Sequence, residues 1–170
     1  MDLPEVLDAK EDVVEEAGAR ASCERHTVRV DLRQATWPEA LLAAGYQPQR
    51  PSVWLIEGLL FYLTRPAVDA LLGKVGALTA GGSLLGLDVM NRGLFFSPVA
   101  WPMQAALARR GATGRFGTND PERLMARHGW EADVTQPGEE GANYGRWPRP
   151  MVPREVPSLT RSFLVKARRS

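Results

Sequence analysis

Residues 50–63 read RPSVWLIEGLLFYL, and this stretch decides the fold class. An apolar run at 53–56 ends in Glu57-Gly58, and a second apolar run follows at once. The first run predicts a buried strand, where a carboxylate without a partner is costly. In open α/β sheets, ligands bind beyond the carboxyl ends of the strands. Glu57 is therefore either a ligand-holding acid at the rim of a sheet or an acid that caps the next helix or lies in water.

Strand and helix patterns alternate along the rest of the chain. Apolar and β-branched runs predict strands at 26–32, 53–59, 83–89, 130–134 and 162–167. Caps and three- to four-residue apolar spacing predict helices at 4–17, 38–44, 64–80, 99–110 and 121–128. This alternation favours an α/β fold with a parallel, doubly wound sheet. Acids lie at the ends of successive predicted strands, which suggests a nucleotide-type ligand across the carboxyl edge: Asp31, Glu57 and Asp88.

Composition narrows the function classes. The 170 residues suffice for one domain, and a formal net charge of +1 argues against a general nucleic-acid binder. Residues 1–90 carry 8 Lys/Arg and 13 Asp/Glu, a net of −5, whereas residues 91–170 carry 13 and 7, a net of +6. The basic half either faces an anionic substrate or is a solvated surface.

The expected location is cytoplasmic. Cys23 is the only cysteine, so an intrachain disulfide is impossible, as suits a reducing compartment. The first residues are acidic and lack a signal-peptide pattern, and no apolar run approaches the length of a membrane span. We therefore expect no membrane association, and the sequence leaves the oligomeric state open.

Several sequence blocks, in order along the chain, resemble one family. They are Asp2-Leu3-Pro4, Asp31-Leu32-Arg33, the EGLLFYL block at 57–63, and the ending at 152–157 with 162–165. Together they resemble the leucine carboxyl methyltransferase-like family of class I S-adenosylmethionine-dependent methyltransferases, in particular its bacterial polyketide-type O-methyltransferase branch. The resemblance covers essentially the whole chain and implies a Rossmann-like sheet with helices on both faces.

The resemblance also implies a cofactor, S-adenosyl-L-methionine, and a role for each matching residue. Asp2 would accept hydrogen bonds from the ribose hydroxyls. Asp31 would accept from the adenine amino group, and Leu32 would pack on the adenine ring. Glu57 would face the methionine and sulfonium end, where a negative charge offsets the positive sulfur. Methyl transfer needs alignment more than an acid or base, so no catalytic side chain is named.

The methyl acceptor is expected to be a small molecule with a hydroxyl or carboxylate group. Segments 91–118 and 136–158 are candidate lid or substrate segments. Four aromatic residues would line the pocket, or else pack beneath a helix: Phe95, Phe96, Trp101 and Tyr144. His128 is either a general base or a structural histidine with a partner. No cluster of histidines, cysteines or acids has metal-ligand spacing, so no metal site is expected.

One feature departs from the family pattern. Family members carry a first strand and a glycine-rich loop upstream of the acidic turn, whereas here Asp2 stands at the second position. We therefore expect residues 1–170 to be the C-terminal part of a single methyltransferase domain that lacks its first strand and glycine-rich loop. The alternatives are a truncated, non-catalytic remnant or partner-binding α/β fragment, and an unrelated α/β nucleotide-binding protein.

Overall fold

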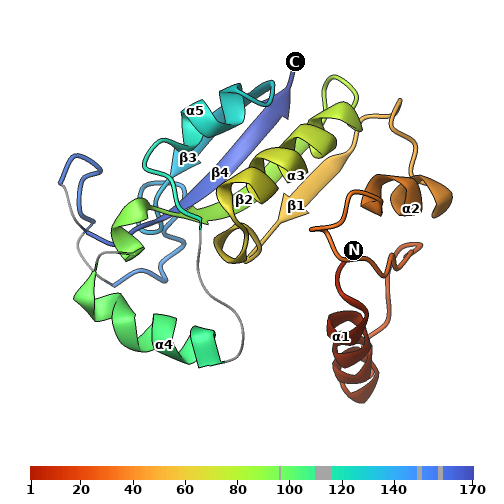
Figure 1. Ribbon diagram of the computed structural model, residues 1–170, viewed down its shortest axis with the longest axis horizontal. Helices are drawn as coiled ribbons and strands as arrows, with labels where there is room; N and C mark the ends of the chain where they lie inside the picture. Colours follow the sequence, from red (N-terminus) through yellow and green to blue (C-terminus); the bar gives the residue numbers. More distant parts are fainter. Residues whose placement is uncertain (96, 110–115, 149–150, 157–158) are drawn as a thin grey trace. The chain divides into compact units, whose positions relative to one another are not determined.

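The computed structural model describes residues 1–95, 97–109, 116–148, 151–156 and 159–170 (Figure 1). The chain divides into two compact units, Met1–Pro48 and Gln49–Ser170. Each unit is described by itself.

The N-terminal unit holds two helices, both close to their predicted positions. Helix α1 spans Pro4–Glu16 and buries Leu7, and helix α2 spans Trp37–Ala43 and buries Trp37. Each begins with a proline in its first turn, where the missing N–H costs no helical hydrogen bond.

The strand predicted at 26–32 is wrong. This segment forms only one isolated parallel bridge, between Asp2 and Arg29. The Asp2 N–H donates to the Val28 carbonyl at 3.3 Å, and the Val30 N–H donates to the Asp2 carbonyl at 2.9 Å. The alternating residues at 26–32 favour an extended backbone. A strand also needs a neighbouring segment that pairs with it over several residues, and here only Asp2 pairs.

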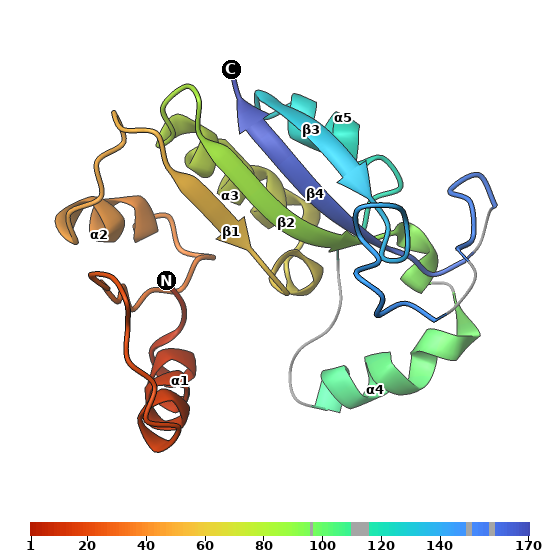
Figure 2. The same cartoon turned by 180° about the vertical axis from the view of Figure 1, so that it is seen from behind.

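The C-terminal unit is built on a four-stranded sheet with the order β1-β2-β4-β3 (Figures 1 and 2). Its strands are β1 (Val53–Ile56), β2 (Leu84–Met90), β3 (Trp130–Thr135) and β4 (Ser162–Arg169). Strands β1 and β2 are parallel, whereas β4 runs antiparallel to both β2 and β3. The α/β class is confirmed, but the all-parallel sheet is wrong. No helix is assigned in the described residues between β3 and β4, and an antiparallel return needs none.

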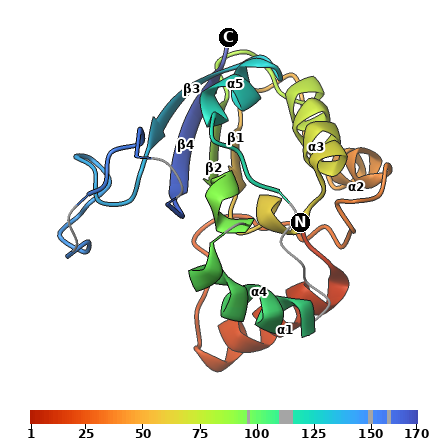
Figure 3. The same cartoon turned by 60° about the vertical axis from the view of Figure 1, so that its left-hand side comes forward.

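Two helices pack on one face of this sheet. Helices α3 (Arg65–Ala77) and α5 (Pro121–Ala126) lie in front of the strands in Figure 1 and behind them in Figure 2, and Figure 3 shows the sheet from another side. The Thr64 hydroxyl caps α3 by accepting from the Ala67 N–H. Alternate strand residues meet the helices and form the core with them: Ile56, Leu85, Leu87, Val89, Phe163, Val165, Ala167, Val68, Leu72 and Leu124.

Residues on the opposite face of β1 are exposed, which corrects the prediction of a buried strand at 53–59. Val53 is 77% exposed and Leu55 is 67% exposed, although Ile56 is buried. Because successive side chains of a strand point to opposite faces, only every second residue of this edge strand meets α3. The strand ends at Ile56, and a turn with Gly58 at φ +61° leads into the short 3₁₀ helix η1 (Leu60–Tyr62).

The remaining described elements connect the strands. After β2 come the 3₁₀ turns η2 (Arg92–Phe95) and η3 (Pro98–Ala100), then helix α4 (Trp101–Arg109). Among the described residues, none of the helices combines the length and apolar character that crossing a bilayer requires.

Candidate functional site

Two acids meet where β1 and β2 end. The Gly58 N–H donates to Oδ1 of Asp88 at 2.7 Å, so Asp88 closes the turn that follows β1. Asp88 is half-buried, whereas Glu57 is exposed. Among the described residues, none pairs with the Glu57 carboxylate. Glu57 is therefore an exposed, unpaired carboxylate at the rim of the sheet, and its role as a ligand-holding acid stays a prediction.

The other predicted cofactor residues lie in the N-terminal unit. The Val30 N–H bonds to the Asp2 carbonyl, so Asp2 lies beside the segment that continues into Asp31 and Leu32. The Asp2 side chain is exposed and accepts from the Leu3 N–H at 2.8 Å. The structure thus places Asp2 beside the segment that leads into the acidic turn, and the ribose and adenine roles stay predictions.

Arg33 forms an ion pair with the Asp31 carboxylate. Its Nε and Nη2 donate to the two carboxylate oxygens at 2.6–3.0 Å, and its backbone N–H donates to Oδ1 at 2.9 Å. These hydrogen bonds hold the pKa of Asp31 below its ordinary value. Asp31 is therefore ionised at neutral pH, but Arg33 already occupies its acceptor positions.

The predicted substrate aromatics give a mixed outcome. Phe96 and the side chain of Phe95 lie outside what the structure describes. Trp101 is 62% exposed and Tyr144 is 83% exposed, and neither lines a described cleft. These residues remain predictions without a pocket to support them.

A cleft of about 360 Å³, not predicted from the sequence, lies where β2 ends and β4 begins. Its walls include Met90, Trp147, Met151 and Arg161. Segment 136–158, predicted as a lid, supplies part of these walls. Met90 lies two residues beyond Asp88 on the same face of β2, roughly 7 Å along the strand, so the cleft adjoins the acidic rim. Met90 lies one residue beyond the strand predicted at 83–89, and nothing local indicated that Arg161 and Trp147 would line a cleft with it.

His128 has a structural role. Its Nε2 lies 3.2 Å from Oδ1 of Asp69 on α3, and its side chain is 13% exposed. Burial acts to raise the pKa of Asp69, but hydrogen bonds from His128 and Arg65 hold it below its ordinary value. His128 therefore joins the end of α5 to α3, and the interpretation as a partnered histidine is confirmed.

Comparisons with known proteins agree with this architecture. The family model for leucine carboxyl methyltransferase matches residues 1–76. A Streptomyces avermitilis protein with the provisional name S-adenosyl-L-methionine-dependent methyltransferase is 43% identical over 148 residues, covering 86% of this chain and 50% of that protein. A Rhodococcus jostii protein with the same provisional name is 35% identical over 172 residues, covering 94% of this chain and 56% of that protein. The chain spans about half the length of the curated relatives it matches.

Solved structures share the fold. A DUF574 family protein from Streptomyces avermitilis superposes with a TM-score of 0.65 at 15% identity, covering 99% of this chain and 63% of that chain. A Thermobifida fusca protein provisionally described as a methyltransferase gives a TM-score of 0.59 at 20% identity, covering 98% and 60%. These structures show the shared fold alone, whereas the family-model match and the sequence relatives show that the chain belongs to the leucine carboxyl methyltransferase-like family of S-adenosylmethionine-dependent methyltransferases.

Proposed function

We propose that this chain is part of a methyltransferase that uses S-adenosyl-L-methionine to methylate a hydroxyl or carboxylate oxygen of a small molecule. The observation that carries the proposal is 43% identity over 148 residues to a protein provisionally named as such an enzyme. The exposed, unpaired thiol of Cys23 suits the proposed cytoplasmic location.

The described acids suit such a cofactor. S-adenosylmethionine carries a positive sulfonium, ribose hydroxyls and an adenine amino group, all of which favour anionic or acceptor groups. Glu57 offers a carboxylate that no described residue engages, and Asp31 is held in its ionised form. In this proposal Asp2 and Asp31 of the N-terminal unit bind the nucleoside end and Leu32 packs on the base. Separately, Glu57 of the C-terminal unit faces the cationic end.

The residues of this chain would bind and orient rather than react. When bound, the cofactor supplies a methyl group to the acceptor oxygen, whose lone pair forms the new C–O bond while the S–C electron pair stays on sulfur. A carboxylate acceptor needs no deprotonation at neutral pH, whereas a hydroxyl acceptor loses a proton. His128 is engaged with Asp69 and is not assigned as the base.

Calorimetric titration of the chain with S-adenosylmethionine tests the proposal. We expect saturable binding with one site per chain, and displacement by S-adenosylhomocysteine. Absence of heat and of displacement would contradict cofactor binding by this chain.

The second candidate function is a non-catalytic, partner-binding fragment. Exposed apolar residues on the sheet face favour it, because contiguous apolar surface often marks an interaction site: Val53, Leu55 and Leu84. This candidate predicts no cofactor binding, so the same titration separates the two functions.

A further inference from the structure

The cleft beside the end of β2 has an apolar rim. Trp147, Val152 and Leu159 line it and are 42%, 39% and 41% exposed. Deeper in the walls lie the thioethers of Met90 and Met151, which adapt readily to flat or irregular apolar groups. A volume of about 360 Å³ lies within the range of small-molecule sites.

One cation in this cleft has no counter-charge. Arg161 is only 9% exposed, and its guanidinium donates to the backbone carbonyls of Val152, at 3.3 Å, and of Val156. Within the described ranges, no carboxylate lies within ion-pair distance of it. A buried charge is normally paired, because removing it from water is costly. Arg161 therefore places an uncompensated positive charge in a cleft whose other lining residues are mostly apolar, with Gln136, Thr160 and Ser162 as the polar ones.

The backbone holds Arg161 firmly in place. Its N–H donates to Oδ1 of Asn91 at 3.0 Å, and its carbonyl accepts from the Asn91 N–H at 2.9 Å. Nδ2 of Asn91 donates to the Leu159 carbonyl at 2.7 Å. These bonds tie both sides of the cleft to the end of β2, so the charge is fixed before any ligand arrives.

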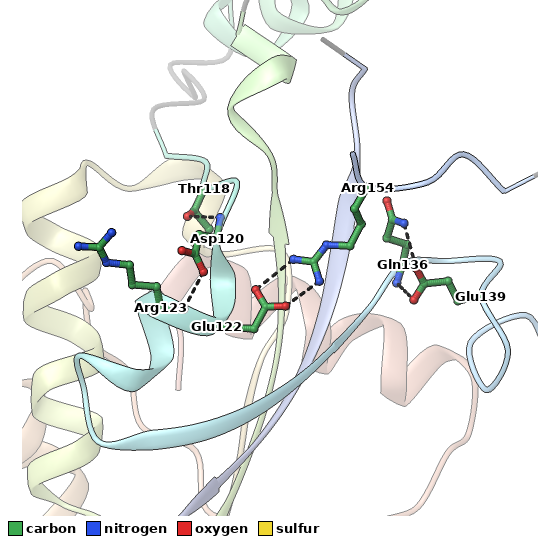
Figure 4. A network of polar contacts seen from close by, with 7 residues as sticks. All are labelled: Thr118, Asp120, Glu122, Arg123, Gln136, Glu139 and Arg154. Carbon is green, nitrogen blue, oxygen red and sulfur yellow. Dashed lines mark hydrogen bonds and ion pairs between the residues drawn. The ribbon is translucent and has the colours of Figure 1, made fainter. Parts of the chain in front are cut away.

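Two acids bond to other residues of this unit (Figure 4). Glu122 on α5 pairs with both terminal nitrogens of Arg154, at 2.6 and 3.0 Å. Glu139 accepts from the backbone N–H and from Nε2 of Gln136, both at 2.9 Å. Glu122 is therefore paired with Arg154, and Glu139 bonds to Gln136 rather than to Arg161, so among the described residues no carboxylate pairs with Arg161 and a ligand anion could do so.

We propose that this cleft binds a small aromatic or apolar molecule that carries one negative charge. The apolar body packs against Met90, Met151 and Trp147, and the anionic group faces Arg161. A guanidinium suits a carboxylate because it presents several donors in one plane. The proposal rests on the cleft alone and requires no cofactor, so it fails or succeeds separately from methyl transfer.

The test is calorimetric titration with 2-naphthoate, and with 2-naphthalenemethanol as the neutral probe of the same shape. We expect naphthoate to bind roughly tenfold more tightly, since a hydrogen bond to a charged group favours the anion. Arg161→Met should remove that preference, whereas Arg161→Lys should retain part of it. The control is Arg168→Met, which deletes an exposed arginine at the far end of β4 and should change nothing.

A second pair of variants keeps the test valid if Arg161→Met unfolds. Leu159 lies on the exposed rim, where polar substitutions are tolerated. Leu159→Glu should weaken naphthoate binding by repulsion, roughly fivefold or more relative to Leu159→Gln, and leave the neutral probe unaffected. Equal affinity for the two probes, or equal naphthoate affinity in the two Leu159 variants, would overturn the proposal.

Discussion

At the scale of single residues, Arg33 controls both the charge of Asp31 and its freedom to accept other hydrogen bonds. It lowers the pKa of the carboxyl and also fills the acceptor positions that an adenine amino group would need. The side chain of Arg33 is 68% exposed, so displacing it from Asp31 buries no charge. Competition between Arg33 and the cofactor is therefore a direct consequence of the proposed adenine role.

Arg33→Ala should strengthen S-adenosylmethionine binding at pH 7, because Arg33 no longer competes with the cofactor for Asp31. The gain should be roughly twofold to fivefold, since an ion pair at the surface contributes less than about 1 kcal/mol. The pKa of Asp31 should rise toward its ordinary value. Calorimetry gives the affinity, and NMR titration of the carboxyl gives the pKa. Arg25→Ala, which breaks the ion pair with Glu11 in the same unit, is the matched control and should leave affinity unchanged. Weaker binding by Arg33→Ala would count against the adenine role of Asp31.

The ion pair between Glu122 and Arg154 predicts a pH dependence of stability. Hydrogen bonding from Arg154 holds the pKa of Glu122 below its ordinary value of 4.5. A carboxyl with a lowered folded-state pKa stabilises the fold above its unfolded pKa, and that contribution is lost as pH falls through the folded value. Glu122→Gln should therefore destabilise the chain by about 1 kcal/mol at pH 7, and by progressively less below pH ~4.

Denaturant unfolding at pH 7 and at pH 3 measures this difference. Glu140→Gln is the control, because the Glu140 side chain is exposed and pairs with none of the described residues. If Glu122→Gln lowered the free energy of unfolding equally at both pH values, the packing of this side chain, and not its charge, would be what stabilises the fold.

At the scale of elements, strand β1 presents two different faces. Leu55 is 67% exposed, whereas Leu87, on the neighbouring strand and the opposite face, is 4% exposed. Leu87→Ala should cost roughly 2–5 kcal/mol in the free energy of unfolding because it leaves a cavity beneath the helices. Leu55→Ala should cost less than about 1 kcal/mol. Chemical denaturation of both variants checks the orientation of the sheet, and equal costs would show that the exposed face is covered in solution.

Helices were the easiest elements to predict from sequence. Thr64 with a proline one residue inside the helix marked the start of α3, and Asp120 marked the start of α5. Their signals are local, because a cap acts within one turn. The prediction of a strand at 26–32 failed because strand pairing depends on a partner distant in sequence, and here the only pairing residue is Asp2.

Strand direction and cleft formation could not be predicted. The apolar pattern of β4 is the same whichever way the strand runs, so nothing local showed that it lies antiparallel between β2 and β3. Glu57 directly follows β1, as predicted, whereas Asp88 lies within β2, two residues before its last residue. Arg161 was missed because its partners are backbone carbonyls, which leave no signal in the sequence.

At the scale of the whole molecule, the two units carry opposite charge. Residues 1–48 contain 5 Lys/Arg and 10 Asp/Glu, a net of −5, and residues 49–170 contain 16 and 10, a net of +6. The proposed nucleoside-binding acids belong to the negative unit, and the cleft with Arg161 belongs to the positive unit. An anionic ligand would thus be attracted by the unit that holds Arg161, and a cationic cofactor by the unit that holds Asp2 and Asp31, whereas Glu57 is a local negative charge in the positive unit.

The most direct test of the central claim is the dissociation constant for S-adenosylmethionine of the wild-type chain, Asp31→Asn and Glu57→Gln, with Arg168→Met as the control. The account predicts that the wild type and the control bind equally, and that each acid variant binds roughly tenfold more weakly, the effect of losing one charged hydrogen bond. Wild-type affinity in both acid variants would contradict the assignment of these carboxylates to the cofactor.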